Sequence, residues 1–317
     1  MTKLVITLFL SSCLASSAFG ASAFQCVIVG DAGKLATSPT GVSWTLRTSG
    51  QAGQLNGVAF GNNVMVAVGA SGKIITSPDG VVWTSRSNSF GSNNISAVAF
   101  NASAGVFVAG GAGGIEYGGV DGSTWSIATV TGGQPGTILS MNPAANGFIA
   151  AGTASFVYQS TDGMNWSRTS VDSNSYSIAT ISYLPGYGYL MGVNGGIGVK
   201  TSPDLVTWTT KGWAETASTS AGGYIIFNGS GGAWYTQTLT SFTGFGSPGI
   251  SVGYGKNTND GSEVFLWGDA FASLYSGSKV YNATLVTSSF VSTAIRGASC
   301  GMYNQIVPNT RRVILVN

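Results

Sequence analysis

The acidic side chains are the residues of this chain best suited to chemistry, because the sequence contains no histidine to act as a general base. Four aspartates recur about every 41 residues, each in a turn that ends in tryptophan: Asp79, Asp121, Asp162 and Asp204. The remaining carboxylates follow no motif: Asp31, Glu116, Asp172, Glu215, Asp260, Glu263 and Asp269. Hydrolysis of a glycosidic bond needs two carboxylates facing one sugar bond, and this second group supplies the candidates. Without a motif, we expect each of them to be a solvated surface charge.

The sequence contains few residues that could bind a metal or a cofactor. Without histidine, a zinc or copper site would depend on the cysteines, of which there are only three. The glycines between 110 and 114 lie between two expected strands rather than before a helix, so they are typical of a turn and not of a phosphate loop. The formal net charge is only +2, which favours neither nucleic acid nor an anionic surface. The sequence therefore predicts no metal, no cofactor and no nucleic-acid partner.

The recurring aspartates belong to a repeat that organises the whole chain. Its clearest copy is the turn Ser-Pro-Asp-Gly-Val-Val-Trp at residues 77–83. Related turns end in the other recurring tryptophans, Trp44, Trp125, Trp166 and Trp208, as this one ends in Trp83. A period of about 41 residues is typical of propellers and solenoids.

Each repeat contains four short apolar runs separated by turn residues, the pattern of antiparallel strands. In the second repeat we expect strands at Leu55–Phe60, Val64–Val68, Lys73–Thr76 and Val81–Arg86. Glycine and proline mark the turns between them, at Gly69–Gly72 and at Pro78–Gly80. Four strands in a period of this length form one blade of a propeller.

The number of repeats predicts the fold class. Second strands begin at Cys26 and near residues 64, 106, 148, 189, 224 and 264, which gives seven units. The first unit lacks its innermost strand, while a strand at Thr293–Tyr303 has no unit after it. We therefore expect an all-β protein, a seven-bladed β-propeller of four-stranded antiparallel blades whose ring is closed by a C-terminal strand. This closure would bring Cys300 beside Cys26 as a disulfide, the alternative being two separate buried thiols.

The N-terminus is typical of a secretory signal peptide over residues 1–23, with cleavage after Gly20 or Ala23. Leu10-Ser11-Ser12-Cys13 also resembles a bacterial lipobox, which would make Cys13 a lipidated N-terminus. Residues 24–317 would then form one domain, with no later apolar run long enough for a transmembrane helix. We expect a secreted, periplasmic or cell-surface protein.

The repeat turn resembles the Asp-box, or BNR, repeat of sialidases, other glycoside hydrolases and photosystem II assembly-factor propellers. The usual box is Ser-x-Asp-x-Gly-x-Thr-Trp, so these turns are shortened variants. The resemblance implies a propeller fold and a structural role for the box aspartates and tryptophans. It does not extend to the sialidase arginine cluster, because Arg47, Arg86 and Arg168 follow the box tryptophans on expected outer strands.

Tryptophans outside the boxes suggest binding. Trp213, Trp234 and Trp267 could form a stacking surface for a glycan or protein, or could replace missing box tryptophans in the core. We favour a non-catalytic binding or scaffolding propeller. One alternative is a glycan-active hydrolase that uses Glu116, Glu215, Glu263 or Asp269. Another is a surface subunit that self-associates through Val313–Val316, within a tail at residues 311–317 that could instead clamp the ring.

Overall fold

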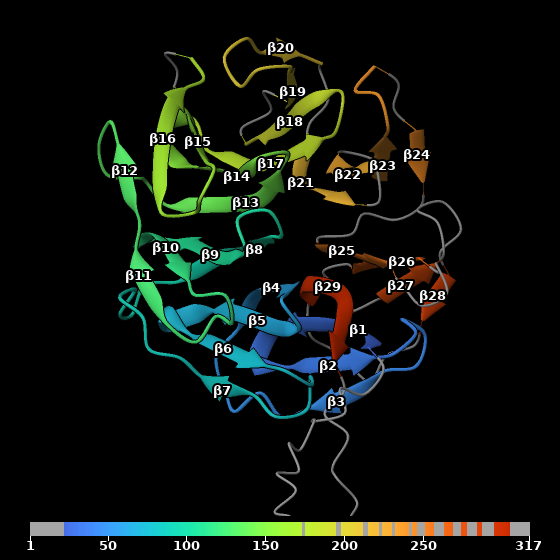
Figure 1. Ribbon diagram of the computed structural model, residues 1–317. Coiled ribbons are helices and arrows are strands. Elements are labelled where there is room, and N and C mark those ends of the chain that lie inside the picture. Colours follow the sequence, from blue (N-terminus) through green and yellow to red (C-terminus); the bar gives the residue numbers. More distant parts are fainter. Residues whose placement is uncertain are drawn as a thin grey trace, which may run out of the picture.

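The computed structural model describes residues 22–304 except 173–174, 195–197, 212–214, 222–223, 230–231, 241–242, 246–250, 257–262, 269–273, 278–283 and 287–294. The described strands form seven sheets arranged around a common centre (Figure 1). The first sheet is ordered β29 (Ile295–Asn304), β1 (Ser22–Gly30), β2 (Leu35–Ser38) and β3 (Thr45–Arg47). The second contains β4 (Leu55–Gly61), β5 (Val64–Gly69), β6 (Ile74–Ser77) and β7 (Thr84–Ser85).

The third sheet contains β8 (Ile95–Asn101), β9 (Val106–Gly111), β10 (Gly114–Gly118) and β11 (Trp125–Ile127). The fourth contains β13 (Ile138–Ala144), β14 (Gly147–Gly152), β15 (Phe156–Ser160), β16 (Asn165–Ser170) and, outermost, β12 (Thr129–Thr131). The fifth contains β17 (Ile178–Leu184), β18 (Gly188–Val193), β19 (Gly198–Ser202) and β20 (Thr209–Thr210).

The sixth sheet contains β21 (Glu215–Ala221), β22 (Tyr224–Gly229), β23 (Gly232–Thr236) and β24 (Thr243–Phe245). The seventh contains β25 (Ser251–Lys256), β26 (Glu263–Gly268), β27 (Leu274–Gly277) and β28 (Thr284–Val286). Three one-turn 3₁₀ helices join second to third strands: η1 (Asp31–Gly33), η2 (Ala70–Gly72) and η3 (Thr153–Ser155). No helix in the described part of the chain is long and apolar enough to cross a membrane.

The core lies between neighbouring sheets. The second strands are nearly continuous apolar runs, because their side chains are buried on both faces of the sheet. In β5, for example, Met65 and Ala67 pack toward the first sheet, whereas Val66 and Val68 pack toward the third. The interfaces among the first five sheets repeat this alternating pattern of buried apolar side chains.

Two details correct the sequence analysis. The fourth sheet has five strands rather than four, because β12 pairs in parallel with β16 at its outer edge. The fourth strand of the second sheet is shorter than Val81–Arg86, because Val81 and Val82 belong to the preceding turn and donate their amides to Asp79. The prediction of four-stranded antiparallel sheets is otherwise confirmed in the described residues.

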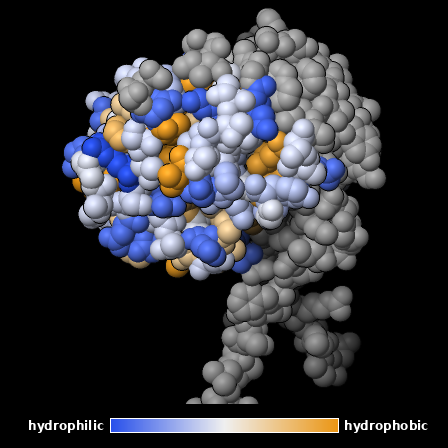
Figure 2. Space-filling view, turned by 90° about the horizontal axis from the view of Figure 1, so that it is seen from above, coloured by the Kyte–Doolittle hydropathy of each residue, from blue (hydrophilic) through white to orange (hydrophobic). Residues whose placement is uncertain are grey.

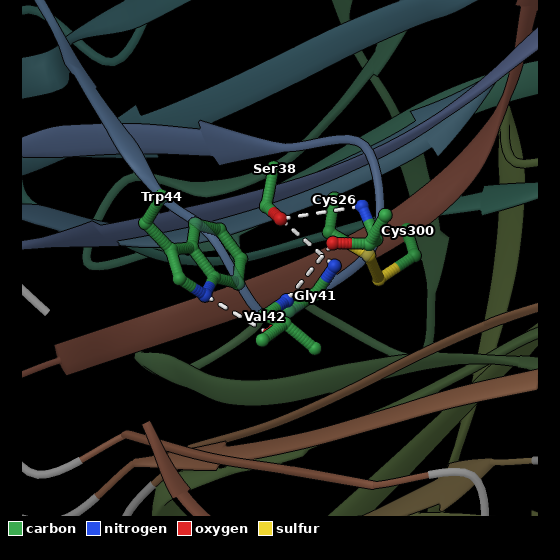
Figure 3. Close-up of a disulfide and its surroundings, with 7 residues drawn as sticks. Cys26, Ser38, Gly41, Val42, Trp44 and Cys300 are labelled. Atoms are coloured by element: carbon green, nitrogen blue, oxygen red, sulfur yellow. Dashed lines mark hydrogen bonds between the residues drawn. A yellow bond between two sulfur atoms is a disulfide. The ribbon is translucent and has the colours of Figure 1, made fainter. Parts of the chain in front are cut away.

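The first sheet joins the two ends of the described chain. Strand β29 runs antiparallel to β1, and Cys26 lies opposite Cys300. The two cysteines form a disulfide with a sulfur–sulfur distance of 2.04 Å, beside the first box turn (Figure 3). Strand β29 also lies against β25 of the seventh sheet and β4 of the second.

Candidate binding site

We use "box turn" for residues 38–44, 77–83, 119–125, 160–166 and 202–208, which join the third and fourth strands of the first five sheets. In the second of these, Asp79 Oδ1 accepts hydrogen bonds from the amides of Val81 (2.8 Å) and Val82 (3.0 Å). The indole N–H of Trp83 donates to the Gly80 carbonyl oxygen at 3.1 Å. The box aspartate thus stabilises its own turn by accepting backbone hydrogen bonds, as aspartates commonly do in tight turns.

The same bonds recur in the other box turns. Asp162 and Asp204 each accept two backbone amides, and Asp121 accepts one. In the first turn, Thr40 replaces aspartate and its hydroxyl accepts the Val42 amide at 3.3 Å. The first turn keeps the indole bond, from Trp44 to the Gly41 carbonyl at 3.0 Å (Figure 3). All four box aspartates are therefore engaged within their own turns.

These hydrogen bonds lower the pKa of the box aspartates. Burial raises the pKa of Asp162, but hydrogen bonds from Asn165, Met164 and Ser160 outweigh it and lower the pKa from 3.8 to about 2. The pKa of Asp79, Asp121 and Asp204 is lowered by hydrogen bonds of the same kind. Since a general acid at neutral pH needs a raised pKa, the box aspartates are unsuited to that role.

A second recurring contact joins the third strand of a sheet, through a side chain, to the segment of chain that leads into that sheet. We call that segment, between the outer strand of one sheet and the inner strand of the next, the connecting loop. In the third, fourth and fifth sheets, the third-strand residue that pairs with the second residue after the box tryptophan contacts this loop. These residues, which we call lock residues, are Glu116, Tyr158 and Lys200.

Glu116 corrects an expectation from the sequence. It is 2% exposed and so is no surface charge. Its Oε1 accepts the backbone amide of Ser89 at 2.8 Å, and its Oε2 has no hydrogen-bond partner among the described residues. Burial raises the pKa of Glu116, and the Ser89 hydrogen bond only partly opposes the shift. Glu116 therefore contacts the connecting loop at Ser89 rather than a second carboxylate, which agrees with its role as a lock residue.

The lock of the fifth sheet is a charged cluster. Lys200 Nζ lies 2.9 Å from Asp172 Oδ2, and the Tyr176 hydroxyl donates to the same oxygen at 2.6 Å. Lys200 also donates to the Tyr176 oxygen at 3.2 Å. Burial, followed by the hydrogen bond to Asp172 and its charge, raises the pKa of Tyr176. A tyrosine held protonated is a poor nucleophile, so this cluster joins the loop to β19 rather than activating a hydroxyl.

The arginines of the repeat also have local partners. The guanidinium groups of Arg47 and Arg86 donate to Thr37 and Thr76 on the neighbouring third strands. Arg168 lies over the ring of Phe156, 4.3 Å from its centroid. They lie on or next to separate outer strands, and the described residues show no arginine cluster.

A cleft lies along the side of the fourth sheet that faces the fifth. Its volume is about 490 Å³, within the range of about 300–1,000 Å³ that is usual for small-molecule sites. The lining combines the sheet itself, the turn between β13 and β14, the fourth box turn, and Tyr189 of β18. Exposed hydroxyl and amide side chains supply its polar surface: Thr131, Asn146, Gln159, Thr161, Asn165 and Ser167.

Strand register explains how these polar groups come together. Thr131 lies opposite Ser167, Ser167 opposite Gln159, and Gln159 opposite Ile149. Residues paired in this way form a row across one face of a sheet. The additional strand β12 extends the row outward, beyond the part that the fifth sheet covers with Tyr189 and Trp208. Among the described residues, no charged side chain lines the cleft.

Such a lining can hold a ligand, and its described residues include no carboxylate, lysine or arginine. Amides and hydroxyls both donate and accept hydrogen bonds, and they suit a neutral polar ligand. Figure 2 shows the side of the molecule where the fourth and fifth sheets lie, on which small hydrophobic patches stand within a mostly hydrophilic surface. The cleft is therefore the candidate site in the described part of the chain.

Several residues predicted from the sequence lie outside this site. Trp213 and Val313–Val316 fall outside the described residues. Trp234 belongs to β23 and Trp267 to β26, the third strand of the sixth sheet and the second strand of the seventh, so the fold places them on different sheets. Glu215 and Glu263 begin strands β21 and β26. Of the cleft residues, Trp166 was predicted as a box tryptophan. The polar ones gave no sequence signal beyond Thr129-Val130-Thr131, whose β-branched side chains favour a strand.

Comparisons with known proteins show the fold. No protein-family model matches the chain, and no curated protein matches its sequence. A solved structure of YCF48 bound to D1 peptide is 18% identical with a TM-score of 0.53, covering 69% of this chain and 76% of YCF48. YCF48 from Cyanidioschyzon merolae is 16% identical with a TM-score of 0.50, covering 76% and 86%. The WD40 β-propeller domain of Doa1 is 13% identical with a TM-score of 0.54, covering 77% and 84%. The chain has the fold of a β-propeller.

Proposed function

We propose that this protein is a non-catalytic binding or scaffolding propeller that acts outside the cytoplasm. The cleft is the observation that carries the proposal, because its described lining offers hydrogen-bonding groups and no pair of carboxylates. The contacts of the box aspartates, Glu116 and Asp172 support it, since these carboxylates hold turns and connecting loops. A structure with the same fold holds a peptide, which supports a protein as well as a glycan as the ligand.

Binding without turnover is the measurement that tests this function. The purified mature protein would be screened against immobilised glycans and peptides, with cleavage products followed in the same wells. We expect at least one class to bind and no product to form. Hydrolysis of any bound glycan would overturn the proposal in favour of a glycan-active enzyme, and the absence of binding to both panels would also count against it.

We further propose that the ring has seven blades and is closed by β29, and that its turns are shortened Asp-boxes. The seven sheets among the described residues and the position of β29 between β25, β1 and β4 support this closure. Replacing both cysteines with serine should then lower the free energy of unfolding by up to about 5 kcal/mol, because the bridge closes a very long loop. A double variant as stable as the native protein in denaturant would contradict a bridge at the only seam.

We propose export by a cleaved signal peptide, and the first strand favours one of the two cleavage sites. Strand β1 begins at Ser22, opposite Asn304 on β29. Cleavage after Gly20 leaves this pairing whole, whereas cleavage after Ala23 removes two of its residues. N-terminal sequencing of the exported protein should therefore begin at Ala21. A mass that shows lipid on Cys13 would instead establish the lipoprotein alternative.

A further inference from the structure

We propose that the cleft beside the fourth sheet binds a short neutral oligosaccharide. This inference rests on the proposed binding function and names its ligand. The described residues that line the cleft are all uncharged. A phosphorylated, sulfated or acidic ligand would lose its hydration in the cleft without gaining a charged partner, which disfavours binding.

The lining also disfavours an apolar ligand. Its largest apolar side chains, Phe148 and Trp166, are each 1% exposed, and their surfaces are already used in the core between the third and fourth sheets. The groups left for a ligand are hydroxyls and amides. A sugar presents hydroxyls that both donate and accept, so each can pair with a side chain of this kind.

The spacing of the polar row fits a chain of sugar units. Thr131, Ser167 and Gln159 lie on three adjacent strands in direct register. Adjacent strands are about 4.8 Å apart, so the row presents its groups at intervals comparable to the spacing of successive sugar rings. Because the row is built on strands rather than loops, its groups are held in position before the ligand arrives.

Two further residues that line the cleft are held in position by their neighbours. The Asn165 side-chain N–H donates to Asp162 Oδ2 at 2.9 Å, which fixes the orientation of the amide. Tyr189 is half-buried and packs against Tyr183 with ring centroids 5.1 Å apart. Burial raises the pKa of Tyr189, so its hydroxyl remains neutral. An aromatic ring held in this way offers an apolar face to the C–H groups of a sugar, and its hydroxyl a polar edge.

The experiment titrates the full mature protein with cellotriose, maltotriose and chitotriose, and with trigalacturonic acid as the charged comparison. Side-chain amide signals of asparagine and glutamine would be followed by NMR. We expect one neutral trisaccharide to shift the amide signals of Gln159, Asn165 and Asn146, and the charged one to leave them unchanged.

A matched pair of variants locates the site. Gln159→Leu should weaken binding of that trisaccharide at least tenfold, because it removes the centre of the polar row. Gln134→Leu, an exposed glutamine in the connecting loop outside the cleft, should leave the affinity unchanged. Both positions are exposed, so both variants should fold, and thermal unfolding would check this.

The outcomes separate this inference from the proposed function. Equal binding by Gln159→Leu, or equal binding of the charged trisaccharide, overturns the assignment to this cleft. If peptides bind in the screen and no saccharide does, the binding function stands and the oligosaccharide inference fails. If neither class binds, both fail.

Discussion

The lock residues lie within the third strands and the box turns follow directly after them, and the two features differ in how uniform they are. Every box turn uses hydrogen bonds between residues two or three positions apart. The locks join residues separated by 27, 22 and 28 positions, and they use a carboxylate, a phenol and an ammonium group in turn. Contacts within a turn involve only the turn itself, so they can be the same in every repeat. A lock residue contacts a connecting loop, and these loops differ from one sheet to the next.

The largest expected effect comes from the box tryptophans. Trp166 is 1% exposed and packs against Phe148, whereas Trp83 is only half-buried. Trp166→Ala should lower the free energy of unfolding by about 3–5 kcal/mol, and Trp83→Ala by less. Urea unfolding of the two variants measures the difference. Equal losses would show that the hydrogen bond to the glycine carbonyl, which both share, matters more than burial.

An exchange between two box turns tests how uniform they are. The fourth residue of the box turn is Gly163 in the fourth sheet and Leu205 in the fifth, both at positive φ (78° and 65°). A Cβ on Gly163 would lie 2.8 Å from Val108 Cγ1, whereas Leu205 is buried in the core. Gly163→Leu should therefore destabilise through both strain and collision.

The reverse change, Leu205→Gly, relieves the backbone but empties a core position. We expect a net loss of about 1–4 kcal/mol, since the cavity outweighs the strain. Denaturant unfolding would measure both variants. A Leu205→Gly protein more stable than the native one would mean that the repeat tolerates glycine in every box.

The lock of the fifth sheet should contribute a smaller amount. The side chains of Lys200 and Asp172 are 12% and 26% exposed, and Lys200→Met leaves Asp172 without its ammonium partner. We expect a loss of about 1–3 kcal/mol, together with faster amide exchange in the loop after β16. Lys73→Met, at an exposed lysine, is the matched control and should change neither.

The contribution of Asp162 to the free energy of unfolding should decrease as the pH falls. The pKa of Asp162 is lowered from 3.8 to about 2, so its stabilising contribution is complete above its ordinary range and is lost as pH falls toward about 2. Asp162→Asn should therefore differ most from the native protein at neutral pH. Unfolding curves measured across this acid range should converge; curves that remain parallel would contradict the assignment.

The contribution of Glu116, the lock residue of the third sheet, should depend on pH in the opposite direction. Because burial raises the pKa of Glu116, the folded protein holds this proton more tightly than the unfolded chain does. The contribution of Glu116 is thus full at acid pH and decreases as pH rises through the folded pKa. Glu116→Gln should remove that decrease, so its stability relative to the native protein rises with pH. A constant difference would mean that Glu116 titrates normally.

This contrast explains what could be predicted from the sequence. The period of the tryptophans and the alternation in runs such as Val64–Val68 depend on local patterns, and they predicted the four-stranded sheets and the position of β29. Glu116 was expected at the surface, because nothing near it in the sequence shows that the loop at Ser89 covers it. The cleft was missed for the same reason, since Thr131 and Gln159 meet only through strand register.

The pairing of β1 with β29 has a consequence for the synthesis of this protein. The ribosome makes β1 at the start of the fold and its partner at the end, so the first sheet stays incomplete until nearly the whole chain has been translated. The middle sheets can assemble earlier, while the inner edge of β1 remains open to incorrect pairing. The Cys26–Cys300 bond can form only after Cys300 has been made. A chain that stops before Cys300 therefore lacks the covalent link between β1 and β29 and keeps Cys26 as a thiol.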